Sequence, residues 1–473
     1  TLDTMYSVSV GPSPTATPAP TGVFATGSID TTTLTPPGDY RYTYSVEYKK
    51  ISNSLAFTER GQPVFVIKSE GQSGNARRRA ELAIIDMYNP MPWGFGLVGC
   101  EGVFLEAAAQ TRALNSAKDV YPLDPIPKKY AFANAGHILT LGSSYNVQDG
   151  KKVRGNVDVA GGLVRGNIIS AGTVKLASGT VRGYINAEDL VTVDGNTVVE
   201  GSIWGRAITG TAKWAGKSTV TPLPVGETEE ACDPLDVAQL VKDRITGSQG
   251  SNNSNNDLPT KYFNRNTAVL NASERNTSPA TIQLGVTGQE KTYYLSSATV
   301  GDNITLQVSG TVNLVMGTLG AGSVPTGGDL TMTSKSARLN IDSGASLRIY
   351  TGGGVYLDQA PFNYADNTAR PTSLIIYSSV VNDPVGAGVP SVNNAKVQLA
   401  APNTLFRGLV YAPYAYIRVK SNNSLYGSLR GRWIRLESNT AFTYDQAAAS
   451  IDATYQGYRV AYWAEQPYDT YGN

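Results

Sequence analysis

The sequence contains few of the side chains on which most catalytic and metal sites depend. Its 473 residues include a single histidine, His137, and two cysteines, Cys100 and Cys232. A Ser-His-Asp triad would have to use His137, and no Gly-x-Ser-x-Gly pattern accompanies it. One histidine and two distant cysteines also argue against a zinc site. We therefore expect no catalytic residue, no metal site and no cofactor.

Charged side chains and long apolar runs are also scarce. Asp, Glu, Lys and Arg make up 16% of the residues, whereas about 25% is usual in soluble domains. The 39 basic and 38 acidic residues leave a net charge of +1, which argues against nucleic acid as a partner. No run approaches the roughly 20 apolar residues of a transmembrane helix. The chain starts at Thr1 without a signal peptide, and we expect that a segment has been removed at that end.

Glycine and tyrosine are abundant, with 49 and 27 residues. Together with many Ser, Thr and Asn residues, they predict short strands joined by tight turns. This composition is typical of proteins outside the cell, where an oxidising compartment favours a disulfide between Cys100 and Cys232. The alternative is two unrelated buried thiols, because spacing alone does not decide. We expect an extracellular or cell-surface protein.

The N-terminal third predicts a small antiparallel β module. Residues 1–30 form a Pro/Thr-rich extended lead in which Tyr6, Val8 and Val10 alternate as in a strand. Residues 31–90 contain three alternating runs separated by turn residues, which predict a three-stranded antiparallel sheet. Residues 91–130 are expected to be a linker, with a helical pattern over 103–118.

A short phrase with a central glycine between two apolar residues recurs along the rest of the chain. Its glycines are Gly155, Gly166, Gly183, Gly201, Gly310, Gly408 and Gly427. The intervals from 166 to 183, from 183 to 201 and from 408 to 427 are nearly equal. Such a repeat predicts a β-solenoid, in which each turn of chain stacks its apolar residues on the turn before. The shorter interval from 155 to 166 breaks the period, and a β-sandwich or barrel is the alternative.

The predicted solenoid has two parts, residues 131–220 and 281–447, separated by an insertion at 221–280. Within the insertion, residues 233–245 predict a helix that Asp233 caps and Pro234 begins. The acidic residues Glu229, Glu230, Asp233 and Asp236 are explained by this helix start better than by a pair of catalytic carboxylates. Residues 448–473 form a Tyr-rich tail. The fold class is therefore mainly β: a small antiparallel module followed by a β-solenoid with a short helical insertion.

Two stretches resemble a known family. "FVIKSEGQSGNARRRAELAIID" (65–86) resembles the periplasmic strands of PilX-type minor pilin-like proteins. The run at 405–447, with "YAP" (411–413), Tyr426-Gly427 and "YDQA" (444–447), and "YWAE" (462–465) near the end, resembles the C-terminal β-helical domain of many bacterial envelope proteins. The middle of the chain is also similar to bactofilins. The resemblance implies an exported structural protein tied to type IV pilus-like machinery.

This chain departs from that family because the apolar N-terminal helix, which packs pilins into a filament, is missing from the sequence. Either this helix has been cut away, or assembly uses strands and aromatic contacts, such as addition of the lead to a neighbour's sheet edge. The candidate assembly residues are Tyr6, Val8, Val10, Tyr455, Tyr458, Tyr462 and Trp463. The tyrosines at 411, 414 and 416 alternate in the same way and are also expected at contacts between subunits or with a capping segment.

Four arginines precede the glycine of their phrase, namely Arg154, Arg165, Arg182 and Arg407. If they align, they form an outer basic stripe that holds acidic polysaccharide; the alternative is an ordinary solvated face. Single acids at turns, among them Asp149, Asp194, Asp302 and Asp342, leave calcium binding open.

The function that these observations favour is structural. We expect a non-catalytic subunit or accessory of an extracellular, pilus-like filament that assembles with copies of itself, with pilus components or with a surface glycan, and that contributes to adhesion. The alternative is a β-helix protein that binds or cleaves polysaccharide.

Overall fold

A computed structural model gives the fold of the chain. It describes residues 22–30, 40–50, 63–73, 76–88, 93–114, 136–141, 143–148, 151–153, 155–211, 213–214, 218–219, 232–274, 278–332, 334–357, 362–364, 370–382, 391–399, 405–451 and 455–467. The chain divides into two compact units, one formed by Thr1–Asn89 with Ala453–Asn473 and the other by Pro90–Asp452. Each unit is described by itself.

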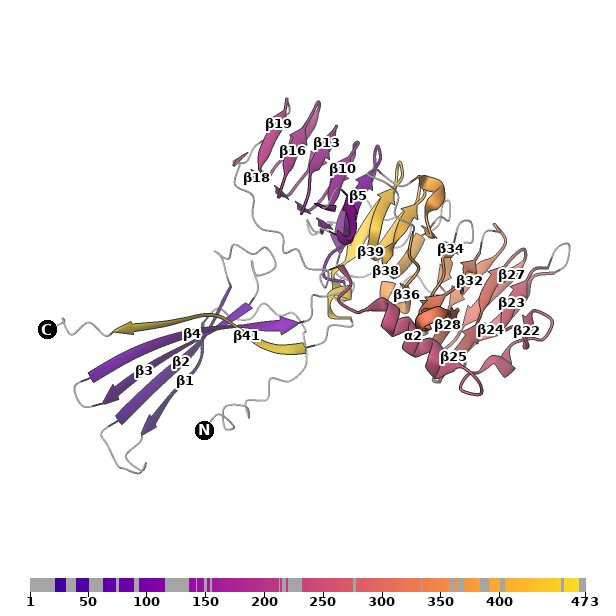
Figure 1. Cartoon of the computed structure of the whole chain (residues 1–473), viewed down its shortest axis with the longest axis horizontal. Coiled ribbons are helices and arrows are strands. Elements are labelled where there is room, and N and C mark those ends of the chain that lie inside the picture. Colours follow the sequence, from indigo (N-terminus) through magenta and orange to yellow (C-terminus); the bar gives the residue numbers. More distant parts are fainter. Residues whose placement is uncertain are drawn as a thin grey trace. The chain divides into compact units, whose positions relative to one another are not determined.

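The first unit is an antiparallel sheet of five strands in the order β1-β2-β3-β4-β41 (Figure 1). Its strands are β1 (Gly22–Asp30), β2 (Tyr40–Lys50), β3 (Pro63–Ser73), β4 (Ala76–Tyr88) and β41 (Tyr455–Pro467). The alternating sequences of β2, β3 and β4 suit a pleated strand, in which successive side chains point to opposite faces. Two strands were not expected. β1 comes from the segment predicted to be an extended lead, and β41 comes from the Tyr-rich tail and pairs with β4.

The second unit is built around a large parallel sheet in which a strand pairs with the strand three places later in the chain. Val157, Val174, Val191 and Ile208 are partners in succession, at equal intervals along the chain. Such pairing generates three columns of stacked strands. In the first half, one column holds β5 (Leu97–Leu105), β10 (Asn156–Val159), β13 (Val174–Leu176), β16 (Leu190–Val193) and β19 (Ala207–Gly210). Another holds β6 (Gln110–Leu114), β11 (Leu163–Val164), β14 (Gly179–Val181), β17 (Thr197–Val199) and β20 (Lys213–Trp214). The remaining column holds β7 (Ile138–Thr140), β12 (Ile168–Ser170), β15 (Ile185–Ala187), β18 (Ile203–Trp204) and β21 (Ser218–Thr219).

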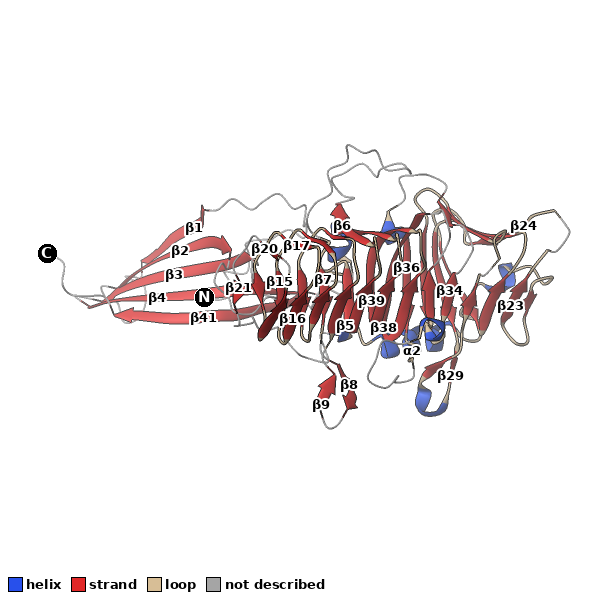
Figure 2. Cartoon of the chain, turned by 90° about the horizontal axis from the view of Figure 1, so that it is seen from above, coloured by secondary structure: helices blue, strands red, loops and turns tan. Residues whose placement is uncertain are grey.

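The second half continues the same three-column arrangement (Figure 2). One column holds β23 (Val269–Ala272), β26 (Ser297–Val300), β31 (Leu330–Thr331), β34 (Val355–Leu357) and β37 (Val397–Leu399); the next holds β25 (Glu290–Leu295), β28 (Thr311–Met316), β33 (Ser346–Thr351) and β36 (Leu374–Ser378); the third holds β24 (Ala280–Leu284), β27 (Ile304–Val308), β32 (Arg338–Ile341) and β35 (Phe362–Tyr364). The strands β38 (Leu405–Val419), β39 (Ser424–Leu436) and β40 (Ala441–Asp445) complete it.

The two halves meet at a seam between the end and the beginning of this unit. β39 pairs in parallel with β5, and β40 pairs with β6. In Figure 1 the yellow strands β38 and β39 accordingly lie beside the purple strand β5. The first strand of the unit is therefore in the middle of the parallel sheet, and the apolar core runs without interruption from one half into the other.

The remaining elements are short, apart from one helix. Among the described residues, α2 (Val237–Ser248) is the one α-helix. Two hairpins leave the parallel sheet, and a third strand pair ends it. They are β8 (Ser143–Gln148) with β9 (Lys151–Val153), β29 (Thr318–Leu319) with β30 (Pro325–Thr326), and β22 (Phe263–Asn264) with β23; the 3-10 turns are η3 (Asn255–Asp257), η4 (Ala321–Ser323), η5 (Pro371–Ser373), η6 (Val392–Asn394) and η7 (Gln446–Ser450).

The predicted helix over 103–118 is wrong. Residues 97–105 and 110–114 are the strands β5 and β6. Nearly every side chain of β5 is buried, because strands of neighbouring turns cover both of its edges and the core covers its inner face. A short apolar run of this kind does not distinguish a buried strand from a helix by its period. The linker predicted for 91–130 is therefore part of the sheet where it is described.

The glycines of the repeated phrase lie at the corners between columns. Gly166, Gly183 and Gly201 stack at one corner, where a Cβ on Gly183 would lie 2.6 Å from the carbonyl carbon of Gly166. Gly155 lies at a different corner, against Thr140 and Leu141. The short interval from Gly155 to Gly166 is thus the distance between two corners of one turn, whereas the longer intervals between the stacked glycines are full turns.

Gly183→Ala is expected to lower the free energy of unfolding by about 1–3 kcal/mol, because the added methyl group meets backbone that must move. Gly247→Ala is the matched control. Gly247 lies in the last turn of α2, and nothing surrounds its Cβ position. That change should raise stability by up to about 1 kcal/mol, the difference in helix propensity. Urea unfolding of both variants measures the effects; equal stability of the two would contradict the stacked corner.

Candidate functional site

The most elaborate side-chain arrangement in the parallel unit is a row of tyrosines. It lies on the outer face of the column that contains β25, β28, β33 and β36. Val315, Tyr350, Tyr377 and Tyr411 are partners on adjacent strands of β28, β33, β36 and β38. The rings of Tyr350 and Tyr377 stack with their centroids 5.1 Å apart. Trp93 packs edge-on against Tyr411, with 5.5 Å between the centroids. In-register pairing thus converts single aromatic residues, far apart in sequence, into one continuous row.

Helix α2 covers this tyrosine row. Val237, Val241 and Ile245 are fully buried and belong to the same apolar cluster as the tyrosines. The guanidinium of Arg244 lies over the Tyr350 ring, 4.9 Å from its centroid, a favourable cation–π distance. The helix therefore exists at this place because it removes an outward-facing aromatic row from water. The sequence placed its start at residue 233; the structure begins it at Val237.

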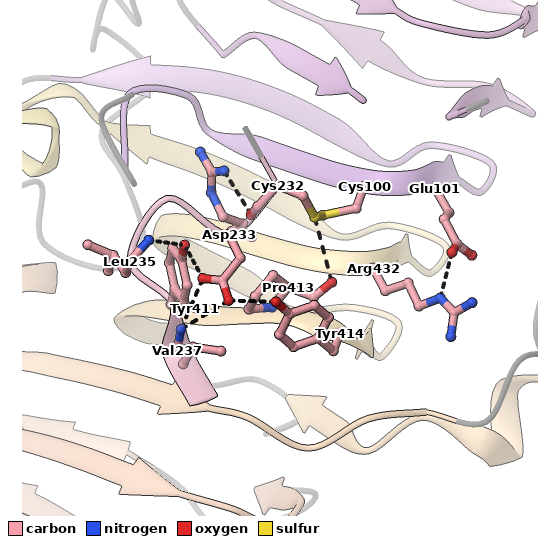
Figure 3. Close-up of a disulfide and its surroundings, with 11 residues drawn as sticks. Cys100, Glu101, Cys232, Asp233, Leu235, Val237, Tyr411, Pro413, Tyr414 and Arg432 are labelled. Atoms are coloured by element: carbon pink, nitrogen blue, oxygen red, sulfur yellow. Dashed lines mark hydrogen bonds and ion pairs between the residues drawn. A yellow bond between two sulfur atoms is a disulfide. The ribbon is translucent and has the colours of Figure 1, made fainter. Parts of the chain in front are cut away.

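Asp233 connects the start of the helix to the row (Figure 3). Its carboxylate accepts hydrogen bonds from the Tyr411 and Tyr414 hydroxyls, both at 2.8 Å, and from the backbone N–H of Val237, at 3.0 Å. Asp236, and not Asp233, is the N-cap residue and accepts from the N–H of Gln239. The prediction that Asp233 is the N-cap residue is therefore wrong, because Asp236 has that role. Asp233 instead joins the start of the helix to strand β38.

A disulfide fastens the residue next to Asp233. Cys232 is bonded to Cys100 of β5, with 5.6 Å between their Cα atoms. The buried guanidinium of Arg430 on β39 donates to the carbonyl of Cys232 at 3.1 Å. One position along β5, the fully buried Glu101 pairs with Arg432 at 2.7 Å. The segment before α2 is therefore attached to both strands of the seam. We call Cys100, Cys232, Asp233, Tyr411, Tyr414 and Arg430 the crossover anchor.

The electrostatics of the crossover anchor favour fixed protonation states. Burial raises the pKa of Tyr411 well above its ordinary value, so its hydroxyl remains a hydrogen-bond donor at all physiological pH. Burial lowers the pKa of Arg430, while Tyr411 and Asp233 act in the opposite direction. The anchor consequently holds the Tyr411 hydroxyl as a donor to Asp233.

The tyrosines expected at subunit contacts lie inside this unit. Tyr411 and Tyr416 are fully buried, and Tyr414 donates to Asp233. Of the two contacts predicted for these tyrosines, with another subunit or with a capping segment, the structure shows the second for Tyr411 and Tyr414, because they pack in one cluster with α2. Of the other assembly candidates, Tyr6, Val8 and Val10 lie outside the described residues. Tyr455, Tyr458, Tyr462 and Trp463 belong to β41 and pair through their backbone with β4.

The predicted basic stripe is corrected at one of its four members, Arg407. Arg165 and Arg182 follow the paired residues Val164 and Val181 and are neighbours on adjacent turns. Arg407 is buried, with 2% of its surface exposed, beside Tyr426 on β39. Arg154 lies outside the described residues. The structure adds Arg112, which follows Thr111, the partner of Val164. Its sequence context lacks the repeated phrase, so no local pattern indicated it.

His137 lies at the start of β7, as part of the third column. Its Nδ1 accepts a hydrogen bond from the backbone N–H of Asn167 at 2.9 Å. Burial lowers its pKa from 6.5 to about 4, which favours the neutral ring. This arrangement gives the imidazole a structural partner on the next turn of chain.

Two properties of the described residues bear on other site classes. No three His, Cys, Asp or Glu side chains among them gather in a group that would hold a metal ion. Asp302 and Asp342, considered for calcium, instead contact Ser334 and Ser309. Among the helices in the described part of the chain, none is long and apolar enough to cross a membrane.

Comparison with known proteins gives limited information. A family described as "Domain of unknown function (DUF7305)" matches residues 244–451. No curated protein matches the chain. Among solved structures, the competence-associated pilin ComZ from Thermus thermophilus is 13% identical, with a TM-score of 0.30 and coverage of 91% of this chain and 85% of that chain. A glycosylated ice-binding protein from Arctic yeast is 9% identical, with a TM-score of 0.22 and coverage of 76% and 94%. These are distant similarities.

Asp233→Ala should lower the free energy of unfolding by about 2–4 kcal/mol, because two tyrosine hydroxyls lose their acceptor and the helix start loses a cap. Asp236→Ala removes only the N-cap and should lower it by about 1 kcal/mol. Chemical unfolding of the two variants under oxidising conditions measures the difference. Equal losses would show that Asp233 does not connect the helix to the tyrosine row.

The stability of the chain should fall as the pH is lowered from 6.5 towards 5. Because the folded-state pKa of His137 lies below the unfolded value, the unfolded chain binds the proton more tightly. The stabilisation is complete above pH 6.5 and is lost as the pH approaches about 4. His137→Gln should remove most of the dependence above pH 5, since His137 is the single histidine. An unchanged slope in that variant would contradict the assignment.

Proposed function

We propose that this protein is a structural, non-catalytic subunit or accessory of an extracellular surface filament, exported and pilus-like. In this proposal the three-column unit is a β-solenoid, a stiff body wound from one chain, and the antiparallel sheet provides the contacts with other subunits. Copies of the chain and pilus components are its partners, and adhesion is a secondary role.

The observation that carries the proposal is the crossover anchor. Its disulfide, half-buried carboxylate and buried arginine are all used to attach one segment of the chain to another. A disulfide is typical of an oxidising, extracytoplasmic compartment, and it supports export. The pilin-like runs at 65–86 and 405–447 support the connection with a filament, since they fall on β3, β4, β38, β39 and β40.

The antiparallel sheet supports a route of assembly. Among the described strands, β1 and β41 are its edges. An edge strand carries unpaired backbone groups that accept an added strand from a neighbour. The lead predicted to supply that strand, residues 5–10, lies outside the described residues, and its exchange between subunits is part of the proposal.

Negative-stain electron microscopy of the purified, oxidised chain tests assembly. The intact chain should form ordered fibres, and a variant lacking residues 1–20 should remain monomeric in light scattering. A variant lacking residues 468–473, which follow β41, is the matched control and should still form fibres. Fibres from the first variant would reject strand exchange by the lead. A monomeric intact chain at all concentrations, alone and with pilus components, would reject the filament role.

A further inference from the structure

Three arginines on successive turns of the parallel unit form a column of positive charge. Arg112, Arg165 and Arg182 each follow an inward-facing residue of the column that contains β6, β11 and β14. The three preceding residues, Thr111, Val164 and Val181, are paired in register. The backbone N–H of Arg165 donates to Thr111 and that of Arg182 to Val164, at 2.8 and 2.9 Å. Adjacent strands are about 4.8 Å apart, so the Cα atoms of these arginines repeat at roughly that spacing. We call these three residues the arginine ladder.

The two ends of the arginine ladder are partnered by other side chains. Arg112 donates to the Thr443 hydroxyl at 2.9 Å. Arg182, with 39% of its side chain exposed, lies 3.8 Å from the carboxylate of Glu200 on the next turn. Arg165 lies between them, and no carboxylate in the described part of the chain forms an ion pair with it.

Stacked like charges on adjacent strands destabilise a sheet. The proximity of Arg165 indeed contributes to the lowered pKa of Arg112, after the larger effect of burial. The repulsion between the stacked arginines is reduced when an anion binds between their guanidinium groups. Because the charges lie in a line along the stacking direction, the ligand that fits is a chain carrying negative charges at a similar repeat.

We infer that the arginine ladder binds an acidic polysaccharide, with successive carboxylates of the glycan chain lying along Arg112, Arg165 and Arg182. Guanidinium groups bind carboxylates through two parallel hydrogen bonds, which fixes orientation as well as attraction. An extended polyuronate carries one carboxylate per sugar, so it presents a series of negative charges along one chain. This inference concerns the parallel unit alone and does not depend on filament assembly.

A second feature at this corner suits a sugar chain. Tyr184 lies across the corner from Arg182, with Gly183 between them, and its ring packs edge-on against Trp204 at 5.4 Å. Both aromatic residues are partly exposed and offer apolar surface to a pyranose ring. Nucleic acid is the less suitable polyanion, because the chain as a whole has a net charge of only +1 and therefore lacks the broad positive field that attracts polyphosphate.

Glu200 defines the limit of the site. Its carboxylate occupies the position after Val199, which pairs with Val181, and so stands where a fourth arginine would continue the row. It competes with a bound carboxylate for Arg182. Removing its charge is therefore expected to strengthen binding, an effect that a merely structural arginine column would not produce.

Calorimetric titration of the full oxidised chain with short oligogalacturonates at low salt tests the inference. Arg165→Gln and Arg182→Gln should each weaken binding by about tenfold, the loss of one charge-assisted hydrogen-bonded pair. Arg338→Gln is the matched control, since Arg338 is exposed on β32 in the other half of the unit; it should change affinity by less than about twofold. Glu200→Gln should increase affinity several-fold.

Two results would overturn the inference. The first is no binding by the intact chain, or equal weakening by Arg338→Gln and Arg165→Gln. The second is tighter binding of duplex DNA than of oligogalacturonate at the same salt concentration, which would assign the arginine ladder to nucleic acid. Retained binding in a variant lacking residues 1–20 is expected, and it separates this result from the outcome of the filament test.

Discussion

The pairing of β39 with β5 is the contact on which the whole parallel unit depends. Every column passes through this seam, because β39 continues into β5 along two stretches, one for each of two columns, and β40 continues into β6 along the remaining column. Without it, each half would end in a row of unpaired backbone groups next to exposed apolar side chains. With it, Leu97, Val103, Leu429 and Ile434 join one buried cluster. The apolar residues of both halves must therefore match in register.

The crossover anchor solves a problem that the seam creates. Since the chain starts in the middle of the stack and winds outward, it must return to the opposite end before the second half begins. At Cys232, just before α2, the chain lies against the seam strands, where Cys100 and Arg430 hold it. Helix α2 then lies along β25, β28, β33 and β36 and covers the tyrosine row. Covalent and apolar contacts thus attach both Cys232 and helix α2 to the parallel sheet.

Features with a local period could be predicted from the sequence. The stacked phrases around Gly166, Gly183 and Gly201 show a full turn of chain directly, and alternation in β2, β3 and β4 shows antiparallel strands. Mainly β structure with parallel stacking is confirmed. Features that depend on distant residues could not be predicted. The buried run at 97–105 resembles a helix until β39 and β10 are placed at its edges. Arg407 and Arg165 share one local phrase, yet only the position of each in the stack decides that Arg407 is buried.

The seam has a consequence for how the molecule is made. Phe95 and Ser428, which are joined by a hydrogen bond at the seam, lie 333 residues apart in the chain. During synthesis the first strands emerge long before the strands that cover them. Until β39 and β40 arrive, the backbone of β5 and β6 lacks the strands that pair with it on one side. A chaperone that shields exposed strands would therefore be most needed for the nascent chain, and cooperative folding would wait for the arrival of β39 and β40.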